Sequence, residues 1–533
     1  MKLYFYGAAR EVTGSCCMVN VKNKNILIDC GLEQGSDEKN NNMLPFRAAD
    51  IDAVLVTHAH IDHSGRLPLL VKNGFNGPIY ATSATCRLLN IMLLDSAHIQ
   101  ETEAGWKRRK EKRAGLPEDE PLYTTEDARN TLSLLHPVEY RQEVPLFPDA
   151  IAVFTDAGHL LGSASITMRL KEAGITRTVV FSGDIGNKDK PIIRDPEYLT
   201  EADYVIMEST YGNKAHDRIR YSIGFLADII DKTLSRGGNV VIPAFAVGRT
   251  QELLYQLREI KEQALVKSMP DFTVHVDSPL ALEATQIYNG DLTGYADEET
   301  LAILKEGFHP LRFPGLKLCR TTEESIALNE DPRPKVIISA SGMCDAGRIR
   351  HHLKHNLWRK ECSIVFSGYQ ANGTLGRMLL DGLSHVKLFG EDVAVRAEIY
   401  NFRGLSSHAD RDGLIEWIRS FKTDLQRVFV VHGEEQIALQ FVDELSARQF
   451  NTTAPQYKAS YDLLQNSCID EGVKPRTLKK QAQNLKSASS TYARLLLAGE
   501  KMMNVIQRNE GGANKDLAKF ADQLLSLAEK WDR

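Results

Sequence analysis

Short apolar segments bounded by Gly, Asn or a charged residue recur along the first 210 residues. The segments are MKLYFYG, CCMVNV, NILIDCG, AVLVTHAH, PIYAT, AVFTDAGH, TVVFSGD and YVIMEST. Such a pattern is typical of β-strands joined by turns. Several of these segments end at His, Asp or Glu, and in layered α/β folds polar residues at strand ends are where functional sites are built. We therefore expect a strand-rich first domain with its chemistry at the strand ends.

Between about residues 212 and 383 the pattern changes to four successive strand–turn–helix units. The units are NVVIPAFAVGRTQELLYQL, FTVHVDSPLALEATQIY, KVIISASGMCDAGRIRHHL and CSIVFSGYQANGTLGRMLL. This alternation predicts a parallel sheet flanked by helices. Several helix N-termini would then lie along one edge, where phosphate groups bind readily. Because strand-like segments return at 393–402 and 428–434, we interpret 212–383 as an insertion into the first domain.

The last 60 residues have the spacing of helices. Two apolar stripes recur every three or four residues and are separated by Gly511-Gly512. The first is Leu495, Ala498, Met502, Val505 and Ile506; the second is Leu517, Phe520, Leu524, Leu527 and Trp531. These stripes suit packing on the body or a homodimer contact. We therefore expect four parts: 1–211, 212–383, 384–460 and a helical extension over 461–533.

Composition excludes several classes of protein. The 533 residues carry 65 Lys and Arg against 70 Asp and Glu, a net charge of −5, so a globally basic nucleic-acid binder is excluded but a local basic groove is not. Eight scattered Cys without a CxxC pair favour a reducing compartment, the cytoplasm. The chain has no stretch of about 20 apolar residues and no apolar leader, so we expect no membrane span.

The densest chemistry lies in THAHIDHSG, where His58, His60, Asp62 and His63 fall within six residues. Residues i and i+2 of an extended segment point the same way, so His58 and His60 can share one metal ion. Asp62 and His63, past the turn, can reach a second. Imidazole and carboxylate ligands together suit Zn²⁺, and also Mn²⁺. The alternative is a chance cluster on a solvated loop.

This HxHxDH segment resembles the metal motif of the metallo-β-lactamase superfamily, and further motifs follow in the family's order. DCG (29–31) resembles its first motif, GHLLGSAS supplies His159, and FSGDIG supplies Asp184. The resemblance implies an α/β fold, an αββα sandwich, with two Zn²⁺. It also implies the ligands: His58, His60 and His159 for one ion, Asp62 and His63 for the other, and Asp184 bridging both.

Three later motifs resemble the β-CASP branch of that superfamily, which consists of nucleases with an inserted α/β domain. They are MESTYGN with Glu208, GLSSHAD with His408, and VVHGEEQ with His432. The resemblance implies that His408 protonates the leaving group, that Glu208 orients it, and that His432 completes the second metal site. The chain resembles the RNA-processing members of this branch because it has His432. The segments CDAGRIRHHL and GYQANGT resemble those of the cleavage-and-polyadenylation type of endonuclease.

The resemblance therefore implies a zinc-dependent ribonuclease that hydrolyses single-stranded RNA. Because water rather than the 2′-hydroxyl would attack, the products would carry 5′-phosphate and 3′-hydroxyl, and both endonuclease and exonuclease action stay open. The first alternative is a hydrolase of small esters or thioesters with the same fold. The second is a non-catalytic subunit that binds RNA, although all seven ligands are present in this chain.

For contacts with the RNA strand we expect the strand–helix turns of the insertion. Backbone N–H groups at helix starts, together with Arg side chains, hold phosphates well, and aromatic side chains stack bases. The candidates are Arg249, Ser339, Ser341, Arg348, His351, His352, Gly368, Tyr369 and Gly373, with Tyr369 or Phe245 as the base-stacking residue. The alternative is that these residues shape the turns and fill the core.

Overall fold

The computed structural model describes residues 1–35, 41–114, 120–215, 223–368, 370, 373–402, 406–473, 502, 506 and 514–531. The chain divides into two compact units, Met1–Val473 and Lys474–Arg533. The first unit contains three large sheets and all the residues of the predicted site.

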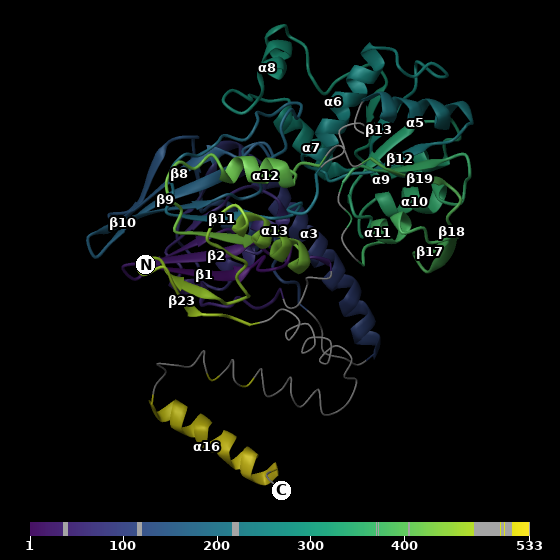
Figure 1. Cartoon of the computed structure of the whole chain (residues 1–533). Helices are drawn as coiled ribbons and strands as arrows, with labels where there is room; N and C mark the ends of the chain where they lie inside the picture. The colour runs from purple at the N-terminus through teal and green to yellow at the C-terminus, as the bar shows by residue number, and fades with distance from the viewer. Residues whose placement is uncertain are drawn as a thin grey trace. The chain divides into compact units, whose positions relative to one another are not determined.

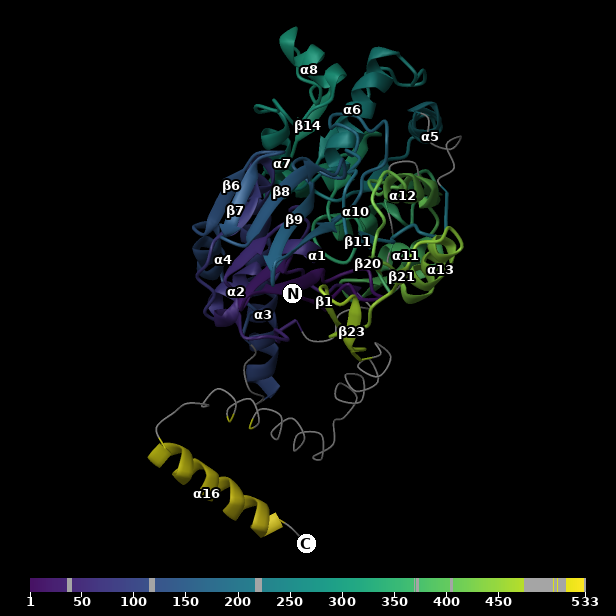
Figure 2. The ribbon, with the colours of Figure 1, turned by 60° about the vertical axis from the view of Figure 1, so that its left-hand side comes forward.

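Two mixed sheets of the first unit face each other as a sandwich (Figures 1 and 2). The first sheet has the strand order β23 (Ser467–Asp470), β22 (Ser460–Asp462), β1 (Lys2–Gly7), β2 (Cys16–Val21), β3 (Lys24–Ile28), β4 (Ala53–Leu55), β5 (Ile79–Thr82) and β6 (Leu135–Val138). The second has the order β21 (Thr452–Thr453), β20 (Arg427–Val431), β11 (Tyr204–Glu208), β10 (Ile175–Phe181), β9 (Ala164–Glu172), β8 (Ala150–Asp156) and β7 (Glu143–Phe147). Phe5, Phe154 and Phe429 are fully buried between the sheets.

Helices cover the outer faces of both sheets. The first sheet is covered by α2 (Leu67–Lys72), α3 (Ser83–Ala114) and α4 (Thr125–Leu132), and the second by α12 (Arg411–Ile418) and α13 (Glu435–Ser446). Two short elements, the 3-10 helix η2 (Ala48–Asp50) and α1 (Ile61–Ser64), lie in the connections of the first sheet. Trp417 and Phe441 bury the apolar faces of α12 and α13 against β20 and β11. The predicted αββα sandwich is confirmed.

The inserted block, teal to green in Figure 1, is built on a six-stranded sheet in which every pairing is parallel. Its order is β14 (Leu316–Leu318), β13 (Val274–Val276), β15 (Val336–Ser339), β12 (Val240–Pro243), β16 (Ser363–Phe366) and β19 (Glu398–Asn401). Its helices are α5 (Ile223–Ser235), α6 (Arg249–Glu262), α7 (Pro279–Tyr288), α8 (Glu298–Lys305), α9 (Thr322–Glu330), α10 (Ile349–Asn356) and α11 (Leu375–Leu380). The predicted parallel sheet flanked by helices is confirmed.

The C-terminal end of the insertion differs from the sequence prediction. After a hairpin of β17 (His385–Leu388) and β18 (Glu391–Ala394), β19 pairs in parallel with β16. The segment 393–402, which we assigned to the returning first domain, therefore extends the inserted sheet. An apolar strand carries no mark of which sheet it joins, because both sheets accept the same residues.

The start of the C-terminal extension also differs. Residues after 460 first form β22 and β23, and β22 pairs with β1 in the first sheet, so the helical part does not begin at 461. Helix α16 (Asn514–Trp531) confirms the predicted second stripe. Of the first stripe, only Met502 and Ile506 belong to the described residues, and both are helical; Leu495, Ala498 and Val505 lie outside them.

No helix among the described residues is long and apolar enough to cross a membrane. All eight cysteines fall within the described ranges, and each is a free thiol.

Candidate metal centre and catalytic site

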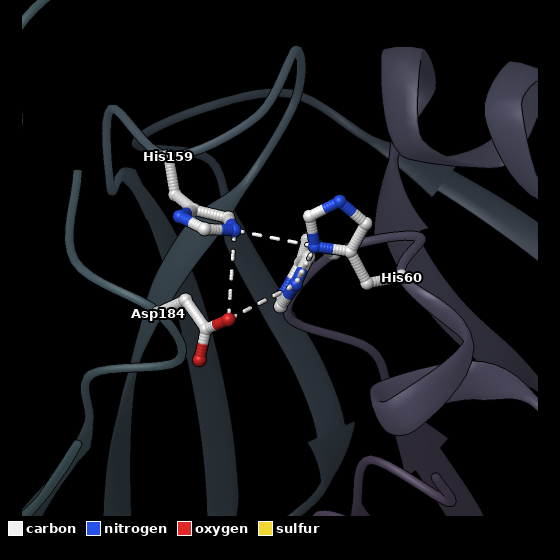
Figure 3. Close-up of side chains that lie close together, drawn as sticks. His60, His159 and Asp184 are labelled. Atoms are coloured by element: carbon white, nitrogen blue, oxygen red, sulfur yellow. Dashed lines mark hydrogen bonds and ion pairs between the residues drawn. The ribbon is translucent and has the colours of Figure 1, made fainter. Parts of the chain in front are cut away.

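The first ligand group consists of three imidazoles and one carboxylate that point toward a common centre. His58 Nε2 lies 3.0 Å from His60 Nδ1, and His159 Nε2 lies 3.2 Å from the same atom. Oδ2 of Asp184 is 3.4 Å from His58 Nε2 and 3.5 Å from His159 Nε2. Figure 3 shows His60, His159 and Asp184 facing one another. Three distant segments of the chain thus meet around one centre.

The second group faces the other oxygen of the same carboxylate. Nε2 of His63 lies 3.2 Å from His432 Nε2, which in turn lies 3.5 Å from Asp62 Oδ2. Oδ1 of Asp184 is 3.2 Å from His63 Nε2 and 3.7 Å from His432 Nε2. Asp184 therefore offers one oxygen to each group, as a bridging ligand would.

Strand direction explains why these residues meet. β10, β11 and β20 are parallel neighbours, so their carboxyl ends lie at one edge of the sheet. Asp184 follows β10, Glu208 ends β11, and His432 follows β20. In the facing sheet, β3 and β4 are also parallel and are followed by Asp29 and His58. The site is thus built at strand ends, as the sequence predicts.

The turn that separates the two ligand groups depends on a glycine. Residues 58–60 lie between strand β4 and helix α1, and helix α1 then turns Asp62 and His63 toward the second group. A Cβ on Gly31 would lie 1.6 Å from the carbonyl oxygen of Asp62. Any side chain at residue 31 would displace this turn, and with it the Asp62 ligand.

Outer hydrogen bonds fix the ring orientation of three histidines. Nδ1 of His63 lies 2.8 Å from Asp29 Oδ2, Nδ1 of His432 lies 3.0 Å from Thr210 Oγ1, and Nδ1 of His159 lies 3.3 Å from the Ser407 carbonyl oxygen. In each ring a proton on Nδ1 satisfies the outer partner and leaves a lone pair on Nε2, which points into the site. Metal-binding histidines are oriented in this way.

Burial keeps the first group neutral. It lowers the pKa of His58 and His159 well below the ordinary value and lowers the pKa of His60 to about 4. These imidazoles therefore carry free lone pairs near pH 7. Three such nitrogens around one centre repel each other unless a cation lies among them.

The residues fit divalent metal ions. Asp184 Oδ1 is buried and accepts no hydrogen bond from the residues that the structure describes, and the nitrogen and oxygen atoms of each group lie within 4.8 Å of one another. Imidazole and carboxylate are the ligands of catalytic zinc sites, and a buried carboxylate needs such compensation. The donor set therefore suits a pair of divalent cations.

His408 lies beside the first ligand group, paired with Glu208. The segment 406–409 runs along residues 185–187, with Ala409 N donating to the Ile185 carbonyl at 2.7 Å. Nδ1 of His408 lies 3.1 Å from Glu208 Oε2 and 3.9 Å from Asp184 Oδ2. Burial by itself would lower the pKa of His408, but the charges of Glu208 and Asp184 outweigh it and raise that pKa. The imidazole is thus held ready to carry a proton.

Glu208 is fully buried, and backbone N–H groups fix the orientation of its carboxylate beside His408. Its Oε1 accepts from the Ile185 N–H at 2.6 Å, and its Oε2 lies 3.4 Å from the Thr210 nitrogen. These bonds hold the carboxylate toward His408 rather than toward the two ligand groups.

Three of the predicted phosphate contacts take part in a hydrogen-bond network around the buried Asp277 in the insertion. Asp277 Oδ2 lies 2.7 Å from His352 Nε2, and Asp277 Oδ1 accepts from Arg348 at 2.6 Å. His352 is fully buried, and its second ring nitrogen lies 2.8 Å from Asn329 Oδ1. Ser339 is buried and donates to the carbonyl of Asp277. His352 and Ser339 are therefore parts of the fold rather than contacts for phosphate, a difference that only burial reveals.

The other candidates lie in the turns after the strands of the inserted sheet. Ser341 is half-buried, and its hydroxyl donates a hydrogen bond to the carbonyl oxygen of Ala346. His351 is exposed and stacks on Phe389. Phe245 is 37% exposed, beside Gly342 and Gly368. Arg249 is buried at the start of α6, and Gly373 is exposed. Tyr369 lies outside the described residues.

A sandwich with convergent His and Asp ligands at its strand ends defines a metallo-hydrolase fold, and comparison with known families agrees. Three family models match: "Metallo-beta-lactamase superfamily domain" over residues 18–184, "Beta-Casp domain" over 250–379, and "Zn-dependent metallo-hydrolase RNA specificity domain" over 392–455. The chain belongs to the β-CASP branch of the metallo-β-lactamase superfamily, as the sequence motifs predict.

The chain is similar in sequence to several proteins of known name over more than four fifths of its length. Ribonuclease TTHA0252 of Thermus thermophilus is 39% identical over 84% of this chain and 96% of its own length. Transcription termination factor FttA of Methanosarcina mazei is 32% identical over 82% of this chain and 68% of its own, and FttA of Methanocaldococcus jannaschii is 30% identical over 83% and 68%.

Sequence reasoning missed several supporting residues. Asp29 lies in a recognised motif, yet its bond to His63 appears only in the structure. Thr210 and Ser407 lie in the motifs of Glu208 and His408, yet their contacts with His432 and His159 appear only in the structure, and Lys190 lies in no motif. Lys190 donates to the His159 carbonyl across a turn whose shape the sequence does not specify.

Proposed function

We propose that this protein is a zinc-dependent ribonuclease that hydrolyses phosphodiester bonds of single-stranded RNA and leaves 5′-phosphate and 3′-hydroxyl ends. The observation that carries the proposal is the His408–Glu208 pair, set beside seven convergent ligands. A proton donor next to a bridged ligand set is what departure of an alkoxide requires. The relative named a ribonuclease, and the match to an RNA specificity domain, support RNA as the substrate.

The chain's own residues supply the proton transfer and the positioning. His58, His60, His159 and Asp184 would hold one Zn²⁺, and Asp62, His63, His432 and Asp184 the other. Two bound zinc ions would supply Lewis acidity that activates water and stabilises charge on the phosphate. As the oxygen of water bonds to phosphorus, that water gives up one proton to the surrounding solvent. As the bond to the 3′ oxygen breaks, His408 gives its proton to that oxygen and is then reprotonated from solvent. Glu208 keeps the imidazolium oriented and charged for this step.

For the strand itself we propose contacts at the turns of the inserted sheet. Ser341, Arg348 and His351, with the backbone at Gly368 and Gly373, would hold phosphates, and Phe245 or Tyr369 would stack a base. Arg249, the remaining candidate, is buried and paired with Glu252, so we leave it out of this set. The exposure of Phe245 and the position of its turn, at the carboxyl ends of parallel strands, support this choice.

The deciding experiment uses RNA labelled at the 5′ or the 3′ end, incubated with the zinc-loaded protein with and without a chelator. We expect cleavage that the chelator abolishes. The products should be substrates for a ligase that requires a 5′-phosphate, and a 3′-phosphatase should leave them unchanged because they end in a 3′-hydroxyl. The order in which labelled fragments appear separates internal from terminal attack. Products with 2′,3′-cyclic phosphate would refute the proposed chemistry, because they require attack by the 2′-hydroxyl.

Two other functions are tested in parallel. Rapid turnover of a thioester with inert RNA would favour a small-substrate hydrolase. RNA binding without any hydrolysis in the presence of Zn²⁺ or Mn²⁺ would favour a non-catalytic subunit.

Three further proposals concern the chain as a whole. We propose that the first domain comprises residues 1–211 together with the segment after about 402, and that the insertion lies between them. We propose the cytoplasm as its location, because eight free thiols suit a reducing compartment. The apolar stripe of α16 supports a homodimer, which sedimentation of the full chain and of a chain ending at 473 would test.

A further inference from the structure

Lys190 is a buried cation in the loop that follows Asp184. Its ammonium donates a hydrogen bond of 2.7 Å to the carbonyl oxygen of His159. It also pairs with Glu252 Oε1 at 3.0 Å, and only 8% of its side chain is exposed. A lysine is seldom buried unless it is paired, so these two partners fix its position.

Its counter-charge comes from the inserted block. Glu252 lies in the first turn of α6, and its second oxygen accepts from Arg249 Nη1 at 2.6 Å. All three side chains are more than nine-tenths buried. The start of α6 also packs against this region, because a Cβ on Gly248 would lie 2.7 Å from Leu160. A buried ion cluster thus joins α6 to the His159 turn.

Within this turn, His159 itself is held by three contacts outside the first ligand group. Its N–H donates to Ser163 Oγ at 3.0 Å, its Nδ1 faces the Ser407 carbonyl, and its own carbonyl accepts from Lys190. Only the third contact depends on a charge that the insertion balances. Lys190 also lies on the loop of Asp184, so its displacement would disturb two ligands of the first group together.

We propose that Lys190 is a positioning residue for the first ligand group, and that Glu252 of the inserted block holds it in place. The insertion then has a second task besides contacting substrate: it keeps His159 aligned with Asp184. This inference rests on the proposed function only in that the first group binds a metal ion.

The test measures metal affinity rather than turnover. In the full-length protein, competition with a chromophoric chelator gives the dissociation constants of the two zinc equivalents. Lys190→Met keeps the length of the side chain and removes its charge. We expect one of the two constants to rise about 10-fold or more, the usual cost of losing an outer partner, while the other is unchanged. The visible absorption of the Co²⁺-substituted protein should change for the weakened site alone.

Lys188→Met is the matched control. Lys188 lies two positions earlier on the same loop, is exposed, and pairs with Glu416 at 2.7 Å, away from His159. We expect both of its zinc constants to match those of the wild type.

Glu252→Gln tests the link to the insertion without a change in size. We expect Glu252→Gln to weaken the same zinc site. The double variant Lys190→Met/Glu252→Gln should lose less zinc-binding free energy than the sum of the losses in the two single variants, because both substitutions act through one contact. If Lys190→Met does not fold, Glu252→Gln alone decides the matter by the same two constants.

Unchanged constants in both variants would overturn the inference, as would equal weakening of both sites together with a lower melting temperature, which indicates a general loss of structure. A wild-type protein that binds fewer than two zinc ions would instead overturn the proposed function, and this is visible before any variant is made.

Discussion

The imidazole of His408 lies 3.1 Å from the carboxylate of Glu208, although 200 positions separate the two residues in the chain. Glu208 ends strand β11 of the second sheet, whereas His408 lies in the segment that precedes helix α12. Neither residue belongs to the two ligand groups around Asp184. The proposed proton donor therefore lies outside the two proposed metal sites, and this separation can be tested.

His408→Ala should slow RNA cleavage by about 10²- to 10⁴-fold, the usual contribution of a general acid, while both zinc equivalents stay bound. Single-turnover cleavage of labelled RNA and metal analysis of the same preparation measure the two quantities. His385→Ala, at an exposed histidine on β17, serves as the control and should match the wild type. Loss of zinc together with activity would show that His408 is a ligand.

Asp184→Ala should damage both zinc sites, since one oxygen of Asp184 faces each ligand group. Asp62→Ala should weaken only the second site, because Asp62 belongs to the second group, where its Oδ2 lies 3.5 Å from His432 Nε2. Zinc titration of the two variants measures this difference. A full-affinity site retained by Asp184→Ala would contradict the bridging role.

His352→Ala should reduce the free energy of unfolding by about 3 kcal/mol, because it leaves the buried carboxylate of Asp277 without one of its partners. Urea denaturation measures this loss. The KM for RNA should stay within about twofold of the wild type. His351→Ala, next in sequence but exposed, should leave the stability unchanged. A raised KM with full stability in His352→Ala would instead return this residue to the RNA contacts.

Stability should fall in acid through His275, which lies in the insertion away from the metal centre. Burial, with the nearby charges of Lys317 and Lys335, lowers the pKa of His275 to about 4. The unfolded chain takes up a proton near pH 6.5 while the folded chain does not, so stability is lost as the pH falls from about 6.5 to about 4.

The wild type should therefore lose roughly 3 kcal/mol more than His275→Asn over this range, on the order of 1.4 kcal/mol per pH unit. Urea denaturation of both metal-free proteins at pH 7.5, 5.5 and 4.5 gives the difference. Parallel pH profiles for the two proteins would show that His275 is protonated in the folded state.

The sequence by itself determined the chemistry and the local structure. The spacing in HAHIDH predicts a metal motif, because residues two apart in an extended chain lie on the same side. The repeated pattern of the four strand–turn–helix units predicts a parallel sheet flanked by helices. Together with the resemblance to a family, these local signals named all seven side chains that the structure brings together in the two groups.

Only the tertiary structure decided which distant side chains meet and which polar residues are buried. His63 and His432 meet because parallel pairing of β10, β11 and β20 aligns their carboxyl ends opposite β3 and β4, and pairing partners are not written into an apolar strand. His352 and Lys190 look like surface residues until burial commits one to Asp277 and the other to the His159 carbonyl. Long-range packing, rather than residue type, sets the partner of a buried polar group.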